Sequence, residues 1–196
     1  MPDPRIVVLA SGAGTLLQAL LDSELRRLIV AVGSDQPEAP ALARARAADV
    51  PTFVVPMTDD REVWNRDVVE HLQVHEADLV VTAGFMRILG GPVIEAFENR
   101  IINSHPALLP SFPGAHAVRD AVESGVKVTG CTIHIVNEGV DTGPIVAQCP
   151  VAVEDGDTVE SLHERIKERE RALLVDVLDR VVREGVSVHG RTVEFG

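Results

Sequence analysis

Short apolar runs alternate with amphipathic stretches along the first half of the chain. Residues 5–10 form a run rich in β-branched side chains, which predicts a strand, and residues 16–27 space Leu and Ala at helical intervals. The same order recurs, with strands predicted at 28–35, 51–56 and 78–84 and helices at 39–49 and 59–76. Strands that alternate with helices in this way are typical of a doubly wound, mostly parallel α/β sheet.

The pattern changes in the second half of the chain. Residues 128–136 and 143–153 are strand-like runs joined by the short loop "NEGVDT", which predicts an antiparallel strand-loop-strand portion. A long helix is predicted next, because Asp157 and Glu160 have the spacing of a capping box. The sequence contains no repeat, low-complexity tract or linker, so we predict a single domain over residues 1–196.

Composition narrows the class of protein. The chain has 196 residues, 45% of them hydrophobic, and no apolar run long enough to span a bilayer, so we expect a globular protein without a membrane role. Its first residues lack the features of a signal peptide, which predicts a cytoplasmic location. The only cysteines, Cys131 and Cys149, are far apart and favour an interpretation as small buried hydrophobic residues.

Charge argues against one class of partner. The formal net charge is −12, whereas nucleic-acid binding depends on a basic surface that displaces counterions from phosphates. We therefore expect no nucleic-acid partner. Small anionic ligands remain compatible with this charge, because a few local groups can hold them.

Two segments follow predicted strands. "SGAGT", residues 11–15, is a glycine-rich turn that either binds a phosphate at the start of a helix or is a bare turn, and Leu17 stands where the dinucleotide fingerprint has its third glycine. "AGFMRIL", residues 83–89, lies at the edge where open α/β sheets bind ligands. The residues alone favour the simpler alternative, an ordinary strand end with Phe85, Met86, Ile88 and Leu89 in the core.

An amide and an imidazole stand two residues apart in "NSHPALLPSFPGAH". In extended backbone, the side chains of Asn103 and His105 would face the same side, and the prolines that follow disfavour helix and central strand. The alternative is a turn with an exposed histidine. Asp141 lies in a loop, where most Asp residues only cap or turn the backbone. His116 and His134 add imidazoles without metal-ligand spacing, so no metal site is predicted.

Taken in order, these segments resemble the phosphoribosylglycinamide formyltransferases. The likeness extends from "VVLASGAGTLLQALLD" through "AGFMRIL" and "NSHPALLPSFPGAH" to "GCTIHIVNEGVDTGPIVAQ". Its most specific part is Asn-x-His-Pro followed by Leu-Leu-Pro and Pro-Gly, with Asp141 downstream. The resemblance implies a Rossmann-like formyltransferase fold and an enzyme of purine biosynthesis. It implies transfer of a formyl group from 10-formyltetrahydrofolate to the amine of glycinamide ribonucleotide, without a metal.

The resemblance also assigns residues. It implies that Asn103, His105 and Asp141 are catalytic, with Asn103 and His105 donating to an oxyanion. The family's folate-binding positions match Arg61, Met86, Arg87, Ile88, Leu89, Asn103, Asn137, Glu138, Gly139, Val140 and Asp141. Its substrate-binding positions match Gly14, Thr15, Leu16, Lys167 and Glu170. Leu16 and Ala13 depart from relatives that carry Asn there, which removes side-chain contacts to phosphate. Whether the protein is a monomer or a homodimer stays open.

Three other kinds of protein would share part of this sequence pattern. Methionyl-tRNA formyltransferase would be longer and would carry Arg-Gly rather than Pro-Gly after Leu-Leu-Pro, and formyltetrahydrofolate hydrolase would carry an N-terminal regulatory domain. A non-catalytic nucleotide-binding module would keep the sheet and the glycine turn, and fold alone does not exclude it. The joint presence of Asn103, His105 and Asp141 argues against such a module.

Overall fold

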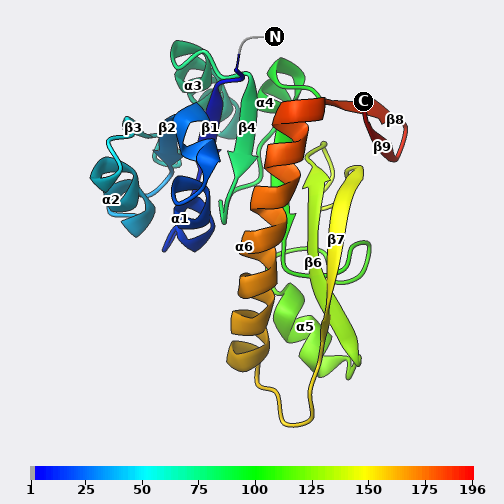
Figure 1. Ribbon diagram of the computed structural model, residues 1–196. Coiled ribbons are helices and arrows are strands. Elements are labelled where there is room, and N and C mark those ends of the chain that lie inside the picture. The colour runs from blue at the N-terminus through cyan, green and yellow to red at the C-terminus, as the bar shows by residue number, and fades with distance from the viewer. Residues whose placement is uncertain (1–2) are drawn as a thin grey trace. The chain divides into compact units, whose positions relative to one another are not determined.

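The first half of the chain contains the predicted parallel sheet. The computed structural model describes residues 3–196, which form two compact units, one ending at Ile102 and the other running from Asn103 to Gly196. In the first unit the strand order is β3-β2-β1-β4, and every pair is parallel. Figure 1 shows these strands among the helices of the first unit. The single domain over residues 1–196 stays a prediction.

The elements of the first unit match the predicted alternation. Their bounds are β1 Ile6–Leu9, α1 Thr15–Leu21, the 3-10 helix η1 Glu24–Leu28, β2 Ile29–Ser34, α2 Pro40–Ala47, β3 Thr52–Val54, α3 Arg61–Val74, β4 Leu79–Thr82 and α4 Gly91–Ala96. Strand β5, Ile101–His105, begins in this unit and ends in the next. All four residues of both β1 and β4 are buried, because parallel strands are covered on both faces. The doubly wound α/β class is confirmed.

The helix predicted over residues 16–27 is interrupted. Helix α1 ends at Leu21, and η1 begins after Ser23, whose backbone is extended. The Ser23 hydroxyl donates to the Leu20 carbonyl over 2.8 Å and accepts from the Leu25 amide over 3.2 Å. Serine thus replaces the backbone hydrogen bonds that a continuous helix would make here, which explains the break.

The second unit holds the antiparallel portion. Its elements are α5 Ala117–Glu123, β6 Val128–Ile135, β7 Ile145–Ala152, α6 Val159–Glu184, β8 Val186–His189 and β9 Thr192–Phe195. The strand order is β6-β7-β9-β8, with β6 and β7 antiparallel as predicted and β7 parallel to β9. The β8–β9 hairpin is an element that the hydrophobic pattern does not predict.

Helix α6 starts one residue later than the capping-box prediction places it. The N-cap is Thr158, whose hydroxyl accepts from the Ser161 amide, while the Ser161 hydroxyl accepts from the Thr158 amide. Asp157 instead accepts two hydrogen bonds from the Arg165 guanidinium, at 2.8 and 2.9 Å. The predicted capping carboxylate is therefore used to fix the first turns of the helix from outside.

One face of α6 packs on the antiparallel strands of the second unit. Figure 1 shows the helix alongside β6 and β7. Leu162 and Ile166 contribute this face to an apolar cluster that includes Val118 of α5, Cys131 of β6 and Val151 of β7. Burial raises the pKa of the Cys131 thiol to about 12, so Cys131 behaves as the buried hydrophobic residue that its sequence context indicates.

We predict that Leu162→Ala destabilises the protein by about 2–5 kcal/mol, because it removes a fully buried side chain and leaves a cavity. Urea unfolding followed by circular dichroism measures this change. The control is Val74→Ala, since Val74 is 71% exposed and its truncation should change stability by no more than about 0.5 kcal/mol. Equal midpoints for the two variants would contradict the packing described for α6.

Candidate active site

Asp141 lies between two imidazoles in the second unit. Its Oδ2 is 3.3 Å from Nδ1 of His105, the last residue of β5, and its Oδ1 is 3.5 Å from Nε2 of His134 on β6. The backbone amide of Gly114 donates to Oδ2 over 2.7 Å. Three segments distant in sequence therefore converge on one carboxylate.

The loop that carries Asp141 is tightly built. Asp141 has a φ of 53°, in the left-handed region that Asp tolerates better than most residues. Gly143 follows it in close contact with β6, since a Cβ there would lie 1.7 Å from the Ile135 carbonyl oxygen. The Asn137 side chain accepts from the Thr142 hydroxyl over 2.9 Å. These contacts fix where the carboxylate points.

The C-terminal hairpin holds the same loop. Arg191, in the turn between β8 and β9, donates from Nη1 to the Thr142 carbonyl oxygen over 3.1 Å. Strand β9 also pairs with the start of β7, with Thr192 opposite Ile145. The loop is thus supported on its β7 side by residues close to the end of the chain.

Asp141 is held in its ionised form. Burial alone would raise its pKa, but the hydrogen bond from His134, the Gly114 amide and the charges of both imidazoles outweigh burial and lower the pKa below its ordinary value. The site therefore places a negative charge beside both imidazole rings.

His105 faces an acceptor at each ring nitrogen. Nδ1 faces Asp141, and Nε2 donates to the Phe112 carbonyl oxygen over 2.8 Å. Two acceptors suit a ring that carries both protons. Phe112 has a φ of 54°, a strained conformation for a bulky residue that costs on the order of 1–3 kcal/mol. This backbone conformation points the Phe112 carbonyl oxygen at the His105 imidazole.

His134 belongs to this cluster, although the sequence assigns it no role. Its Nδ1 lies 3.1 Å from the Ile135 carbonyl oxygen, and its Nε2 lies 3.0 Å from Nδ2 of Asn103. With its proton on Nδ1, the ring accepts from the Asn103 amide, and with both protons it donates to Asp141. A histidine on an antiparallel strand gives no local sign of this contact, because the contact depends on the packing of β6 beside the end of β5.

Glu170 is a buried carboxyl group of the same unit. It accepts from the Ser104 hydroxyl over 2.6 Å, and Ser104 lies between Asn103 and His105 in β5. Burial raises its pKa above the ordinary value of 4.5, and Ser104, Lys167 and Arg171 offset only part of this effect. Lys167, one turn earlier on α6, pairs with Glu164 over 2.7 Å. The predicted pair Lys167 and Glu170 thus lies on a face of α6 next to β5.

In the first unit, the glycine-rich turn is held by its backbone. Gly14 has a φ of 70°, and a Cβ on it would lie 2.8 Å from Ala41, so only glycine fits without strain. The Ala41 amide donates to the Gly12 carbonyl oxygen over 3.1 Å. The Leu16 side chain is buried, so residues 14–16 can offer a ligand their backbone N–H groups and the Thr15 hydroxyl.

The segment after β4 is exposed where the simpler interpretation placed it in the core. Met86 is 64% exposed and Ile88 59%, and only Leu89 is fully buried. That alternative is therefore wrong for Met86 and Ile88. Arg61, at the start of α3, donates from its guanidinium to the Ile88 carbonyl oxygen, which brings two predicted folate-binding positions together.

Each unit thus gathers part of the predicted set. The first unit holds Gly14, Thr15 and Leu16 in one turn and joins Arg61 to the segment Met86–Leu89. The second unit brings together Asn103, His105 and Asp141, adds His134, and contains the loop Asn137–Asp141 with Lys167 and Glu170.

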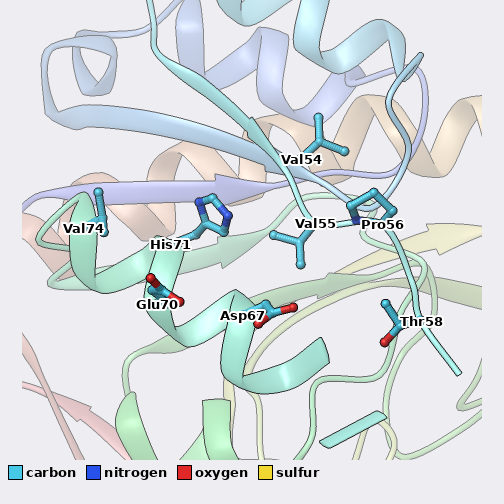
Figure 2. Close-up of a pocket in the computed structure, with 8 residues that line it drawn as sticks. All are labelled: Val54, Val55, Pro56, Thr58, Asp67, Glu70, His71 and Val74. Carbon is cyan, nitrogen blue, oxygen red and sulfur yellow. The ribbon is translucent and has the colours of Figure 1, made fainter. Parts of the chain in front are cut away.

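A pocket of about 420 Å³ in the first unit contains none of these positions. It lies between the end of β3 and helix α3 (Figure 2). Figure 2 shows His71, Glu70 and Asp67 along the helix, opposite Val55 and Pro56. His71 stacks on Phe53 with ring centroids 4.8 Å apart, so its ring serves the packing of β3.

Residues 3–196 lack two kinds of structural feature. No helix in that range is both long and apolar enough to cross a membrane. No group of three or more His, Cys, Asp or Glu side chains among the described residues could hold a metal ion.

Comparisons with known proteins agree with the motifs. A family model described as formyl transferase matches residues 4–178. Phosphoribosylglycinamide formyltransferase of Mycobacterium tuberculosis (strain H37Rv) is 51% identical over 197 residues, covering 98% of this chain and 91% of that protein. The chain belongs to the phosphoribosylglycinamide formyltransferases. The Bacillus subtilis enzyme of that name is 35% identical over 188 residues, which cover 91% of this chain and 94% of that protein.

A solved structure extends the likeness to the fold. The crystal structure of glycinamide ribonucleotide transformylase 1 from Symbiobacterium toebii matches with a TM-score of 0.95 and 42% identity, covering 98% of this chain and 94% of that one. The formyltransferase fold expected from the motifs is confirmed. In this formyltransferase, the residue roles inferred from the resemblance stay predictions.

We predict that Glu170→Gln raises the free energy of unfolding by roughly 1–3 kcal/mol near pH 8, because it removes a carboxylate that is costly to bury. A carboxyl group with a raised pKa in the folded state contributes its full stability below the unfolded value of 4.5 and loses it as pH rises toward the folded value. The advantage of the variant should therefore grow as the pH rises above 4.5.

Thermal unfolding at several pH values measures this difference. Glu168→Gln is the control, since Glu168 is an exposed residue of the same helix. A stability difference that does not change with pH would contradict the buried-carboxylate explanation.

Proposed function

We propose that the protein transfers the formyl group of 10-formyltetrahydrofolate to the amine of 5'-phosphoribosylglycinamide, in purine biosynthesis. The names of its relatives in Mycobacterium tuberculosis and Bacillus subtilis support this acceptor and this group. The observation that carries the proposal is the cluster at the end of β5, where Asn103, His105 and Asp141 converge. It offers an amide, an imidazole and an ionised carboxylate to one reacting centre.

The cluster suits an attack by an amine on a formyl carbon. The new C–N bond gives a tetrahedral centre with a negative oxygen, and the bond from the formyl carbon to the folate nitrogen then breaks. The amine loses a proton, and the folate nitrogen gains one. Because the formyl donor is already activated and the attacking amine is neutral, the protein has to supply only charge stabilisation and proton transfer.

His105 and Asn103 are the proposed oxyanion donors. The Nε2–H of His105 is held by the Phe112 carbonyl oxygen, at 2.8 Å, and would turn from it toward the developing charge. The Asn103 side chain is oriented from behind by His134. Preorganised donors of this kind are commonly worth roughly 2.7–4 kcal/mol each.

Asp141 is the proposed proton relay partner. Its lowered pKa keeps it ionised, so it stabilises the protonated form of His105 across 3.3 Å. A water ordered by this carboxylate would move the proton from the attacking amine to the leaving nitrogen. Asp141 thus acts on both the oxyanion donor and the proton path.

The nucleotide is assigned to two segments. Backbone N–H groups of Gly14, Thr15 and Leu16 are proposed to bind its phosphate. Lys167 is proposed as a further nucleotide-binding residue, because its ammonium group suits an anion. Glu170 is proposed to accept hydrogen bonds from the ribose hydroxyls. The buried Leu16 side chain supports a phosphate contact through the backbone alone.

The folate is assigned to the segment after β4 and the loop before β7. The exposed apolar side chains of Met86 and Ile88 suit contact with an aromatic ring, and Val140 is also 46% exposed. Arg87 and Leu89 are proposed to bind through their backbone groups, as are the loop residues Asn137, Glu138 and Gly139. Arg61 would contribute a positive charge beside Ile88.

The wider expectations stay predictions. They are a cytoplasmic location, no nucleic-acid partner, no metal requirement, and a monomer or homodimer. Gel filtration and an assay in the presence of a chelator address the last two.

We predict that the purified protein formylates glycinamide ribonucleotide with 10-formyltetrahydrofolate when no metal is added. His105→Ala and Asp141→Asn should each lower kcat by roughly 10²–10³-fold, because each removes charge stabilisation at the reacting centre. Product formation is followed by mass spectrometry and folate absorbance.

Asp176→Asn is the control, since Asp176 is exposed on α6. Absence of turnover, or turnover with water alone as acceptor, would refute the proposed reaction. Wild-type rates in either site variant would refute the assigned roles.

We also predict that His134→Leu lowers kcat by roughly 5–100-fold, the effect of losing a hydrogen bond worth about 1–3 kcal/mol, because the Asn103 amide loses its partner. On an Asn103→Ala background the same change should cost much less, since the amide that it orients is gone.

The measurement is a double-mutant cycle on kcat. His189→Leu is the matched control, since His189 is an exposed residue of β8. Fully additive effects would mean that His134 does not act through Asn103.

A further inference from the structure

One buried carboxylate of the first unit has no part in the proposed reaction. Asp35 directly follows β2, and its side chain is only 1% exposed. A charge this deeply buried is costly unless it is paired and hydrogen-bonded. Its partners therefore indicate what the carboxylate is for.

The first partner of Asp35 lies in the glycine-rich turn. The Ser11 hydroxyl donates to Oδ1 of Asp35 over 2.5 Å, and the same hydroxyl oxygen accepts from the Met86 amide over 2.8 Å. The Ser11 amide also donates to the Gly84 carbonyl oxygen over 3.1 Å. Ser11 thus connects the turn after β1 to the segment after β4.

The second partner lies in that same segment. Arg87 donates from Nε to Oδ2 of Asp35 over 2.7 Å, and the Gln36 side chain adds a third hydrogen bond over 2.9 Å. Because Met86 and Arg87 are neighbours in the chain, the contacts close a ring through Ser11 and Asp35. Burial would raise the pKa of Asp35, but these hydrogen bonds and the Arg87 charge together lower it.

The strand order explains why one residue reaches both partners. β1 lies between β2 and β4, and all three strands are parallel, so their carboxyl ends share one edge of the sheet. Asp35 spans from the end of β2 across the end of β1 to the segment after β4. The ring fixes the turn and this segment relative to each other within one unit.

We propose that Asp35 is a positioning residue that couples the phosphate-binding turn to the folate-binding segment. The inference rests on the proposed function, because it needs both segments to bind ligands. A nucleotide phosphate that orders residues 11–16 then orders Met86 and Arg87 through Ser11 and Asp35, and a folate does the reverse. Such coupling is reciprocal, so each substrate should raise the affinity for the other by the same factor.

The test compares Asp35→Asn with Ser11→Ala in the full-length protein. Asn keeps the shape of Asp but loses the charge that holds Arg87, and Ala removes the hydroxyl that joins Met86 to Asp35. In each variant we expect the KM for both substrates to rise roughly tenfold or more, the effect of losing one charge-assisted hydrogen bond, with a smaller fall in kcat.

Equilibrium binding gives the readout that a loss of stability would not produce. Titration calorimetry measures the dissociation constant of glycinamide ribonucleotide with and without saturating tetrahydrofolate. The constant measured without tetrahydrofolate, divided by the constant measured with it, is the coupling ratio. This ratio should exceed one in the wild type and fall toward one in both variants, and the double variant should show no further fall.

Asp22→Asn is the matched control. Asp22 is an exposed carboxylate of the same unit that accepts a side-chain hydrogen bond from Gln18 over 2.8 Å, at the far end of α1. Asp22→Asn should keep wild-type KM values and a wild-type ratio. Circular dichroism and urea unfolding verify that each variant folds, and Ser11→Ala decides the question if Asp35→Asn does not.

The outcomes separate the two proposals. A wild type that binds neither substrate, or that forms no formylated glycinamide ribonucleotide, refutes the proposed function. An active wild type with a ratio of one, or folded variants that keep wild-type KM values and a wild-type ratio, refutes the coupling role of Asp35 and leaves the reaction intact.

Discussion

The carboxylate of Asp141 between two imidazoles is the interaction on which the proposed catalytic cluster of the second unit depends. It brings the end of β5, strand β6 and the loop before β7 to one point. The attraction works only while the carboxylate is ionised, and its lowered pKa secures that state. The strained Phe112 and the left-handed Asp141 itself are local costs that this arrangement has to offset.

Two acids of the second unit have pKa values shifted in opposite directions, and the cause is physical. Asp141 accepts a hydrogen bond from a backbone amide and lies beside two imidazole rings, and its pKa falls. Glu170 receives a single hydroxyl bond and is more deeply buried, and its pKa rises. Environments that shift the pKa values of two acids in opposite directions are typical of functional sites. A protonated Glu170 would also present an O–H donor that an ionised carboxylate lacks.

The sequence predicts the fold well where local pattern and packing agree. The buried runs that became β1, β2 and β4 and the spacing of Asn103 and His105 are local features, so the periodicity finds them. The sequence pattern does not identify His134, because predicting its contact with Asn103 requires knowing which strand lies beside β5. The sequence pattern does not predict the exposure of Met86 either, since an apolar residue after a buried strand is expected in the core until the path of the chain is known. The N-cap of α6 is Thr158 and not Asp157, because the Asp157 carboxylate binds the Arg165 guanidinium. The spacing of residues alone does not reveal this contact.

The contact of Arg191 with the Thr142 carbonyl oxygen places the boundary of the functional part of the chain beyond the region that the formyl transferase family model matches, which ends at residue 178. A shortened version designed from that match would retain every proposed catalytic side chain. It would nevertheless lose the guanidinium that braces the loop carrying Asp141, along with the strand that pairs with the start of β7. A family model marks the part of a chain that it matches, whereas the support of the site can come from residues outside that match.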